Sequence, residues 1–330
     1  MTLMNKTATE ENKELKGKTL EKTITEPKAI VTVPPYAPFI DEIVEHPLVS
    51  GIRLNIVMPL KGSRRDNLKR LQDLAGYKDL WIDLKCRQLR IKTYGVPPFT
   101  EVELSHIIGV NTPTTAYFTG GKEGKIPVTV LAVEGNKLIM QDGPHRVVGP
   151  GESINIPDSS LKIEGYFTET DLQYITAAKE IGLHRYMLSF VEKKEDIDAL
   201  RGFDKNAKII AKIESQKGLG YVAKEWNKNQ ETRLMAARGD LYMEVKKPHE
   251  ILDAVEGIVA KDPSAIAASR ILDSFADSLE PTCQDISDID NLLRMGYRTF
   301  MLGDEVCLRR ESVLSALNLL NAVCERYKGK

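Results

Sequence analysis

The chain has 330 residues, 42% of them hydrophobic, and its 46 lysines and arginines nearly balance its 47 aspartates and glutamates. A net charge of −1 excludes a global field that would attract nucleic acid or anionic membranes, and no apolar run approaches a membrane-spanning length. Residues 1–27 are polar, lack the apolar centre of a signal peptide, and are predicted to form a tail. The four cysteines have no paired spacing, which is typical of free thiols in a reducing compartment and predicts a cytoplasmic protein.

Eight short apolar runs recur along the rest of the chain, and segments with helical periodicity lie between them. The predicted strands are residues 28–33, 51–58, 79–84, 185–190, 208–214, 233–237, 265–269 and 298–302. Most are almost continuously apolar, as strands of a buried parallel sheet are. The predicted helices include residues 39–46, 64–76, 168–182, 285–297 and 311–327. This alternation predicts an α/β fold, a (β/α)8 TIM barrel.

A different composition interrupts the alternation between the third and fourth predicted strands. Residues 96–157 are rich in valine, threonine, isoleucine, glycine and proline, which is typical of short strands joined by tight turns. We therefore predict a small β-rich lid inserted at the barrel mouth. This insertion divides the predicted barrel into a first part, residues 28–95, and a second part, residues 158–330.

The ends of the fifth and sixth predicted strands carry the most informative side chains, because active sites of such barrels lie at the C-terminal ends of the strands. Strand alternation places Lys212 and Glu214 on one inward face, where two ionisable groups need each other or a metal. The carboxylates of Glu214 and Asp240 suit Mg²⁺ or Mn²⁺, and Gly239 lets an anion approach the backbone. A solvated loop explains any one of these charges alone. The inward-facing pair favours a site that stabilises a developing enolate oxygen.

Two motifs resemble the metal and active-site region of pyruvate kinase, "KIIAKIESQKGL" and, later in the chain, "LMAARGDL". Other segments resemble the same family: "GIRLN", "DLKCRQLRI", "LSFVEKKEDIDALR", "ASRILDSFADSLEPTCQDISDIDNLL" and "FMLGDEVC". The resemblance covers roughly residue 28 to the C-terminus. The mobile lid of that family falls where the β-rich insertion is predicted. The resemblance implies chemistry on phosphoenolpyruvate and pyruvate.

The resemblance also implies roles for individual side chains. Lys212 matches the lysine beside the enolate and the transferring phosphoryl group, and Arg53 matches the phosphate-binding arginine. Arg90 matches the arginine in the loop after the third strand. Ser269 stands where the family has a threonine, so the hydroxyl is kept. These four residues are the predicted catalytic groups.

Metal ligands and further substrate contacts follow from the same resemblance. Glu214 and Asp240 match the divalent-metal ligands, which implies Mg²⁺ or Mn²⁺ as cofactor. Asn55 and Asp83 match two ligands of a monovalent cation. The predicted substrate contacts come from strand ends and the turns after them: Ala237, Gly239, Asp240, Ser189 and Glu305.

Other positions depart from the family's pattern. The serine and histidine expected shortly after Asn55 are Val57 and Met58, so the K⁺ site is incomplete and a nucleotide contact is missing. Gly151 or Glu152 stands where a nucleotide-phosphate lysine is expected, and a carboxylate there would repel a polyphosphate. The lid is shorter than in the family, and the chain is expected to lack the family's C-terminal regulatory domain.

Three functional hypotheses remain. The first is a pyruvate kinase-like enzyme that acts on phosphoenolpyruvate or pyruvate through a metal-stabilised enolate, with phosphoryl transfer to a nucleoside diphosphate. The second is a nucleotide-independent lyase, aldolase or decarboxylase of a 2-oxoacid. The third is a non-catalytic barrel that binds a metabolite or a protein. A small anionic substrate is the expected partner of both enzymes. The segment "EPTCQDISD" resembles the family's subunit contact and implies a homo-oligomer, although a polar loop before a helix cap explains it equally.

Overall fold

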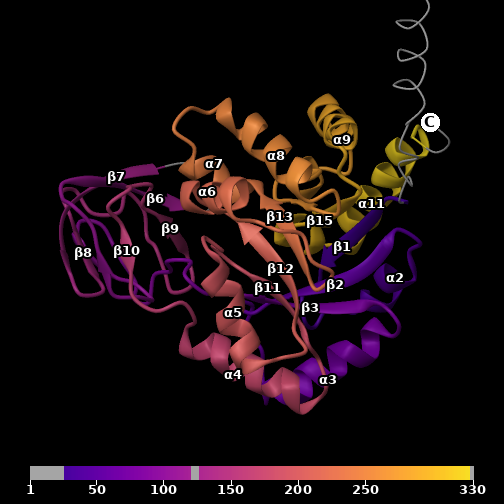
Figure 1. The fold of residues 1–330 in the computed structure, drawn as a ribbon, viewed down its shortest axis with the longest axis horizontal. Helices are drawn as coiled ribbons and strands as arrows, with labels where there is room; N and C mark the ends of the chain where they lie inside the picture. The colour runs from indigo at the N-terminus through magenta and orange to yellow at the C-terminus, as the bar shows by residue number, and fades with distance from the viewer. Residues whose placement is uncertain (1–25, 120–125, 328–330) are drawn as a thin grey trace, which may run out of the picture.

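Parallel strands close into a barrel in the computed structural model of the protein, which describes residues 26–119 and 126–327. The barrel strands are β1 (Lys28–Thr32), β2 (Val49–Asn55), β3 (Asp79–Leu84), β11 (Arg185–Leu188), β12 (Lys208–Ile213), β13 (Thr232–Ala237), β14 (Ile266–Ala268) and β15 (Thr299–Leu302). They follow one another around the barrel in chain order, and β15 pairs with β1 to close it (Figure 1). The predicted (β/α)8 barrel is therefore confirmed. The expected tail, residues 1–27, lies outside the described residues except for its last two.

Helices connect the strands and surround the barrel (Figure 1). They are α2 (Ile40–Glu45), α3 (Arg64–Ala75), α4 (Glu169–Glu180), α5 (Lys194–Phe203), α6 (Gln216–Lys224), α7 (Arg238–Glu244), α8 (Glu250–Lys261), the 3-10 helix η1 (Asp273–Ala276), α9 (Cys283–Met295), α10 (Asp304–Cys307) and α11 (Arg310–Glu325). Side chains determine where several begin: Ser63 accepts a hydrogen bond from the backbone of Asp66, and Thr168 and Thr282 form capping boxes. In the part of the chain described, every helix is too short or too polar to cross a membrane.

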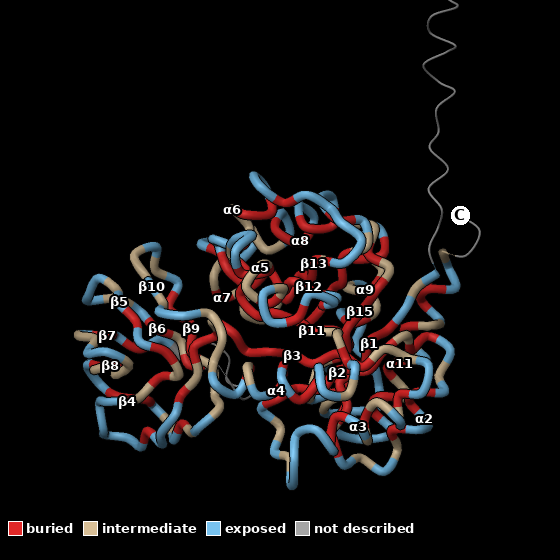
Figure 2. The backbone as a smooth tube through the Cα atoms, turned by 60° about the horizontal axis from the view of Figure 1, so that its bottom comes forward, coloured by how far each residue is buried: buried red, intermediate tan, exposed pale blue. Residues whose placement is uncertain are grey.

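The barrel interior is a separate apolar cluster from the layer that packs the helices onto the strands. Its members are Ile30, Trp81, Met187, Ile210, Met235, Ala237, Ile266, Ala268 and Met301. Figure 2 shows the strands of the barrel as continuously buried backbone. Strand side chains alternate between faces, so Ile210 inside the barrel places Lys212 on the same face, at the C-terminal end of β12.

A β-rich insertion follows β3 and lies to one side of the barrel (Figure 1). Its strands are β4 (Glu101–Glu103), β5 (Ile108–Gly109), β6 (Thr114–Thr119), β7 (Ile126–Glu134), β8 (Lys137–Met140), β9 (Ser153–Asn155) and β10 (Lys162–Ile163). Five of them form an antiparallel sheet in the order β4-β8-β7-β6-β9, and β10 pairs with β5. The strand β10 lies beyond residue 157, the expected end of the insertion. The sheet has its own apolar cluster, including Val102, Phe118 and Val130.

Asp204, at the end of α5, is a buried acid whose ionised form is held by hydrogen bonds. Its side chain is 2% exposed, and it contacts His184 Nδ1 at 2.7 Å and accepts from the Tyr186 hydroxyl at 2.9 Å. Burial alone would raise the pKa of Asp204, but the bonds from His184 and Tyr186 outweigh it and lower that pKa. The ionised carboxylate therefore stabilises the folded protein.

We expect Asp204→Asn to lower the free energy of unfolding at pH 7 by about 1.5–3 kcal/mol, the contribution typical of hydrogen bonds to a charged group. Because the folded pKa lies below the unfolded value of about 3.9, this stabilisation is complete above that value and lost as the pH falls through the folded pKa. Urea unfolding measured from pH 7 to pH 3 should therefore show that the wild type and Asp204→Asn differ less in free energy of unfolding as the pH falls. Asp198→Asn, at a more exposed position on the same helix, is the control.

Candidate active site

The predicted lysine lies at the mouth of the barrel among polar groups from neighbouring strands. Lys212 is 5% exposed, and its Nζ donates to Ser189 Oγ at 2.8 Å and to Asp83 Oδ1 at 3.2 Å. It also forms an ion pair with Glu214 Oε1 at 3.1 Å. Burial alone would lower the pKa of Lys212, but Asp83 and Glu214 outweigh burial and raise it. Lys212 is therefore a fixed positive charge inside the barrel.

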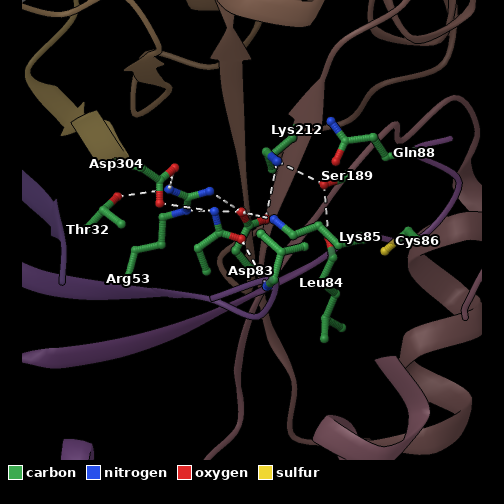
Figure 3. A network of polar contacts seen from close by, with 12 residues as sticks. Thr32, Arg53, Asp83, Leu84, Lys85, Cys86, Gln88, Ser189, Lys212 and Asp304 are labelled. Carbon is green, nitrogen blue, oxygen red and sulfur yellow. Dashed lines mark hydrogen bonds and ion pairs between the residues drawn. The ribbon is translucent and has the colours of Figure 1, made fainter. Parts of the chain in front are cut away.

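Asp83, at the end of β3, binds three cations at once (Figure 3). Its carboxylate accepts from Arg53 Nε at 3.0 Å and from Lys85 Nζ at 2.7 Å, in addition to Lys212. It is fully buried, so burial would raise its pKa, yet Lys212, Lys85 and Arg53 together hold the pKa of Asp83 well below its usual range. Arg53 and Lys212 also pair with Asp304 and Glu214, whereas Asp83 is the only ion-pair partner of Lys85 among the described residues.

Lys85 is therefore the least compensated of the three cations. It is 5% exposed, and burial lowers the pKa of Lys85 to about 7, with the positive charges of Arg90, Lys212 and Arg53 acting in the same direction against Asp83. An anion bound nearby would relieve the repulsion among these cations. The electrostatics of the cluster therefore favour an anionic ligand.

Arg53 joins the cluster to the end of β15. Its NH1 donates to Thr32 Oγ1 at 2.9 Å and to Asp304 Oδ2 at 3.1 Å (Figure 3). Asn55 Nδ2 donates to Asp304 Oδ1 at 3.0 Å, so one acid bridges two predicted site residues. Glu305, the acid predicted to contact substrate, is exposed, and among the described residues no hydrogen bond or ion pair links it to this cluster. Asp304, the first acid after β15, is the one that contacts Arg53 and Asn55.

The two predicted ligands of a monovalent cation have other partners. Asn55 Oδ1 accepts a hydrogen bond of 3.4 Å from the backbone of Val57, and its amide nitrogen binds Asp304. The carboxylate of Asp83 already contacts three side-chain cations. Lys85 Nζ thus contacts the carboxylate that matches a ligand of the incomplete monovalent-cation site.

The two predicted divalent-metal ligands lie at the ends of adjacent strands. Glu214 follows β12, is 2% exposed, and accepts a hydrogen bond of 2.8 Å from the backbone of Phe190. Asp240 lies in the first turn of α7 and accepts from Gln88 Nε2 at 3.1 Å. Burial raises the pKa of Glu214, and the negative charge of Asp240 raises it further. Two coupled carboxylates of this kind suit a hard divalent cation.

These two carboxylates do not form a complete metal cage. Within residues 26–119 and 126–327, no group of three or more histidine, cysteine, aspartate and glutamate side chains is arranged to hold a metal. Mg²⁺ is usually held by one or two carboxylates together with waters and substrate oxygens. The pair therefore fits a metal that is shared with a bound substrate.

A small-residue turn lies beside these carboxylates. Ala237 ends β13 and α7 begins at Arg238, so the backbone N–H groups of Gly239 and Asp240 lie in a first helical turn without intrahelical acceptors. A Cβ on Gly239 would lie 3.3 Å from the Cβ of Ser269, which leaves little room for any larger residue. Ser269 itself adopts a left-handed backbone conformation with φ 65°. The turn thus brings two backbone donors and a hydroxyl-bearing residue together.

Arg90 connects the barrel mouth to the insertion. Its NH2 donates to Gln88 Oε1 at 2.6 Å, and its NH1 binds the backbone oxygen of Gly151. Its Nε is buried and has no hydrogen-bond partner among the described residues. Glu152, the expected obstacle to a polyphosphate, forms an ion pair of 2.6 Å with Arg146, so its charge is neutralised within the insertion.

The sequence left several members of the site unassigned. Lys85, Gln88 and Thr32 were not among the predicted site residues, yet all three bind such residues. Alternation along β3 was one available signal, because Lys85 lies two residues after Asp83. The contact of Asp304 with Arg53 joins the segment after the last strand to the second strand. No local sequence pattern predicts this contact.

Comparison with known proteins identifies a single family. The model of the pyruvate kinase barrel domain matches residues 100–308 of this chain. The pyruvate kinase of Methanocaldococcus jannaschii is 26% identical over 299 residues, which are 84% of this chain and 64% of that protein. The pyruvate kinase of Thermotoga maritima is 28% identical over 302 residues, which are 83% of this chain and 61% of that protein. The chain thus spans less than two thirds of the length of these relatives.

Proposed function

The chain belongs to the pyruvate kinase family, and on that premise we propose that it is an enzyme that acts on phosphoenolpyruvate or pyruvate through an enolate. The observation that carries this proposal is the buried position of Lys212 between Ser189, Asp83 and Glu214. A fixed ammonium in a water-poor site stabilises negative charge that develops on a substrate oxygen. The same charge would hold the carboxylate or phosphate of the ground state.

The other predicted residues have complementary roles in this proposal. Arg53 supplies a guanidinium for the substrate phosphate, and Arg90 offers its unpartnered buried Nε to an anionic group. The backbone N–H groups of Gly239 and Asp240 would bind the substrate carboxylate, and Ser269 would supply a hydroxyl for proton transfer. Glu214 and Asp240 would hold Mg²⁺ or Mn²⁺, which when bound supplies further positive charge for substrate oxygens.

We include phosphoryl transfer between the substrate and a nucleoside diphosphate in the proposed reaction. The ion pair of Glu152 with Arg146 supports it, because it removes the repulsion expected at the lid. A second candidate is nucleotide-independent chemistry on a 2-oxoacid, as in a lyase, aldolase or decarboxylase. The side chain of Val57, which is 41% exposed where the family has serine, favours this candidate.

Two assays, run side by side, distinguish the two candidate functions. Phosphoenolpyruvate, ADP and Mg²⁺ should yield pyruvate, with turnover unchanged when K⁺ is replaced by tetramethylammonium, because Arg53, Lys85 and Lys212 already contact Asp83. The second candidate instead predicts no pyruvate, but exchange of the methyl protons of pyruvate in deuterated water with metal present, followed by NMR. Absence of both signals would overturn both candidates and leave a non-catalytic binding protein.

Oxalate, a mimic of the enolate of pyruvate, is expected to raise the melting temperature of the protein when Mn²⁺ is present. A ligand at 100 times its dissociation constant stabilises the folded state by about 2.7 kcal/mol. The response should disappear in Glu214→Gln, because that change removes one of the two metal carboxylates. Asp73→Asn, at an exposed position on α3, should respond like the wild type. An unchanged response in Glu214→Gln would contradict the assigned metal ligands.

A further inference from the structure

A cavity of about 560 Å³ lies between the insertion and the barrel. The insertion contributes the end of β9 and the residues after it, including Asn155 and Ile156, and the barrel side contributes Tyr221 of α6 and Glu244 of α7. Strand β9 contacts α7 directly, and the two lie close together in Figure 1. The cavity adjoins the candidate active site without being part of it, since Phe190 lines the cavity while its backbone binds Glu214.

One acceptor in the wall of this cavity, the side-chain oxygen of Asn155, has no donor among the described residues. Asn155 is 3% exposed, and its Oδ1 is buried without a hydrogen-bond partner. The Asn155 side chain hydrogen-bonds Glu244, so the unpartnered amide oxygen lies next to a carboxyl group. A buried acceptor without a donor is unfavourable, so a bound donor would stabilise this part of the wall.

The carboxyl of Glu244 lacks a cation of its own. Among the described residues, no lysine or arginine forms an ion pair with it. Four cations line the cavity. Arg87 pairs with Asp196 at 2.6 Å and Glu192 at 3.3 Å, and Lys217 donates to the backbone oxygen of Leu161 at 2.7 Å. Lys224 and Lys246 are exposed and form no ion pair with Glu244. Burial raises the pKa of Glu244 to about 8, with the charges of Asp240 and Glu192 adding to the effect. The charge of Lys217 and the hydrogen bond from Asn155 lower the pKa but do not outweigh burial, so Glu244 is an acid without a direct ion-pair partner.

The rest of the lining defines the body of the ligand. The cavity wall includes several apolar side chains: Leu89, Ile154, Ile156, Leu161, Ile163 and Tyr221. Such surfaces gain free energy by excluding water from an apolar ligand of similar shape. An ammonium group has three donors and one positive charge, which can satisfy both the Asn155 oxygen and the Glu244 carboxylate.

We propose that this cavity is a second ligand site, which takes a small molecule with an apolar body and a primary ammonium group. The ammonium binds Glu244 and Asn155, and the apolar body packs on the isoleucines of the insertion and on Tyr221. Because the ligand touches the insertion and the barrel together, its binding fixes the position of one relative to the other. The inference goes beyond the proposed reaction and does not depend on it.

Isothermal titration calorimetry tests the proposal with three probes that share a phenylethyl group and differ in their polar head. The probes are phenethylamine, phenethyl alcohol and 3-phenylpropionate, which carry a positive, a neutral and a negative head. Phenethylamine should bind the full chain at least tenfold more tightly than the alcohol, and the carboxylate should bind most weakly. Equal affinity for all three, or no measurable binding of the amine, would overturn the proposal.

Two variants locate the binding. Glu244→Gln should weaken phenethylamine at least tenfold while leaving the alcohol unchanged. Gly220→Leu should weaken binding of all three probes, because a Cβ at Gly220 meets nothing within 4 Å and the larger side chain would occupy part of the cavity. Leucine also favours the helix more than glycine, so this variant is expected to fold even if Glu244→Gln does not.

Glu250→Gln, an acid on α8 that does not line the cavity, is the matched control and should bind phenethylamine like the wild type. Amine binding that persists unchanged in Gly220→Leu would place the ligand elsewhere and overturn the assignment. These experiments measure binding without turnover. Their failure is therefore distinguishable from failure of the proposed reaction.

Discussion

Lys212→Met is expected to reduce turnover of phosphoenolpyruvate by at least about 10²–10³-fold, the effect typical of removing one preorganised group that stabilises developing charge. Methionine keeps most of the length of the side chain and removes the ammonium. The reduction should appear in kcat at saturating substrate, because the charge of Lys212 is proposed to act on the enolate more than on the ground state. The measurement is a steady-state assay of pyruvate formation with ADP and Mg²⁺.

The same substitution also affects stability, which the experiment must separate from catalysis. Lys212 is buried beside Asp83 and Glu214, so its removal leaves Glu214 without its ion-pair partner. Circular dichroism melting should therefore accompany the assay, at a temperature where the variant is folded. Lys208→Met is a matched control, because Lys208 lies on the same strand but is exposed at its opposite end. A kcat above one tenth of the wild-type value in Lys212→Met would contradict the proposed role.

The sequence alone predicted the barrel because its signals are local. Each barrel strand is a short apolar run, and the alternation within β12 that places Ile210 inside the barrel also places Lys212 there. Arg53 and Asp83 lie near the ends of neighbouring strands. Their closeness follows from the same topology, because the parallel strands β2 and β3 end at the same end of the barrel. These parts of the site required only the fold and the period of a strand.

Other features depend on contacts that a single sequence does not encode locally. The convergence of Lys85 and Arg53 on Asp83 requires the exact register of two strands, and the bridge from Asp304 to Asn55 requires closure of the barrel. The ion pair between Arg146 and Glu152 neutralises a carboxylate that the sequence alone presents as a free negative charge. Whether a charged side chain is neutralised depends on its burial and its partners more than on its residue type.

Asp83→Asn is expected to be among the most destabilising single substitutions at the barrel mouth, lowering the free energy of unfolding by about 3–5 kcal/mol. Asp83 is fully buried and binds Arg53, Lys85 and Lys212, so the neutral amide would leave three buried cations without their shared anion. Urea unfolding monitored by circular dichroism measures the change. Asp79→Asn is the control on the same strand, where a partly exposed pair with Arg185 contributes only about 0–1 kcal/mol.

The wild type and Asp83→Asn differ in free energy of unfolding, and the pH dependence of this difference distinguishes an electrostatic loss from a packing defect. The folded pKa of Asp83 lies well below its unfolded value, so its stabilisation is complete above about pH 4 and lost as the pH falls through the folded pKa. The gap between wild type and Asp83→Asn should therefore narrow in acid. Adding Lys85→Met to Asp83→Asn should recover part of the stability, because it removes one of the unpaired cations. A loss below about 1 kcal/mol in Asp83→Asn, or no recovery in the double variant, would mean that Asp83 is not the anion that holds these cations together.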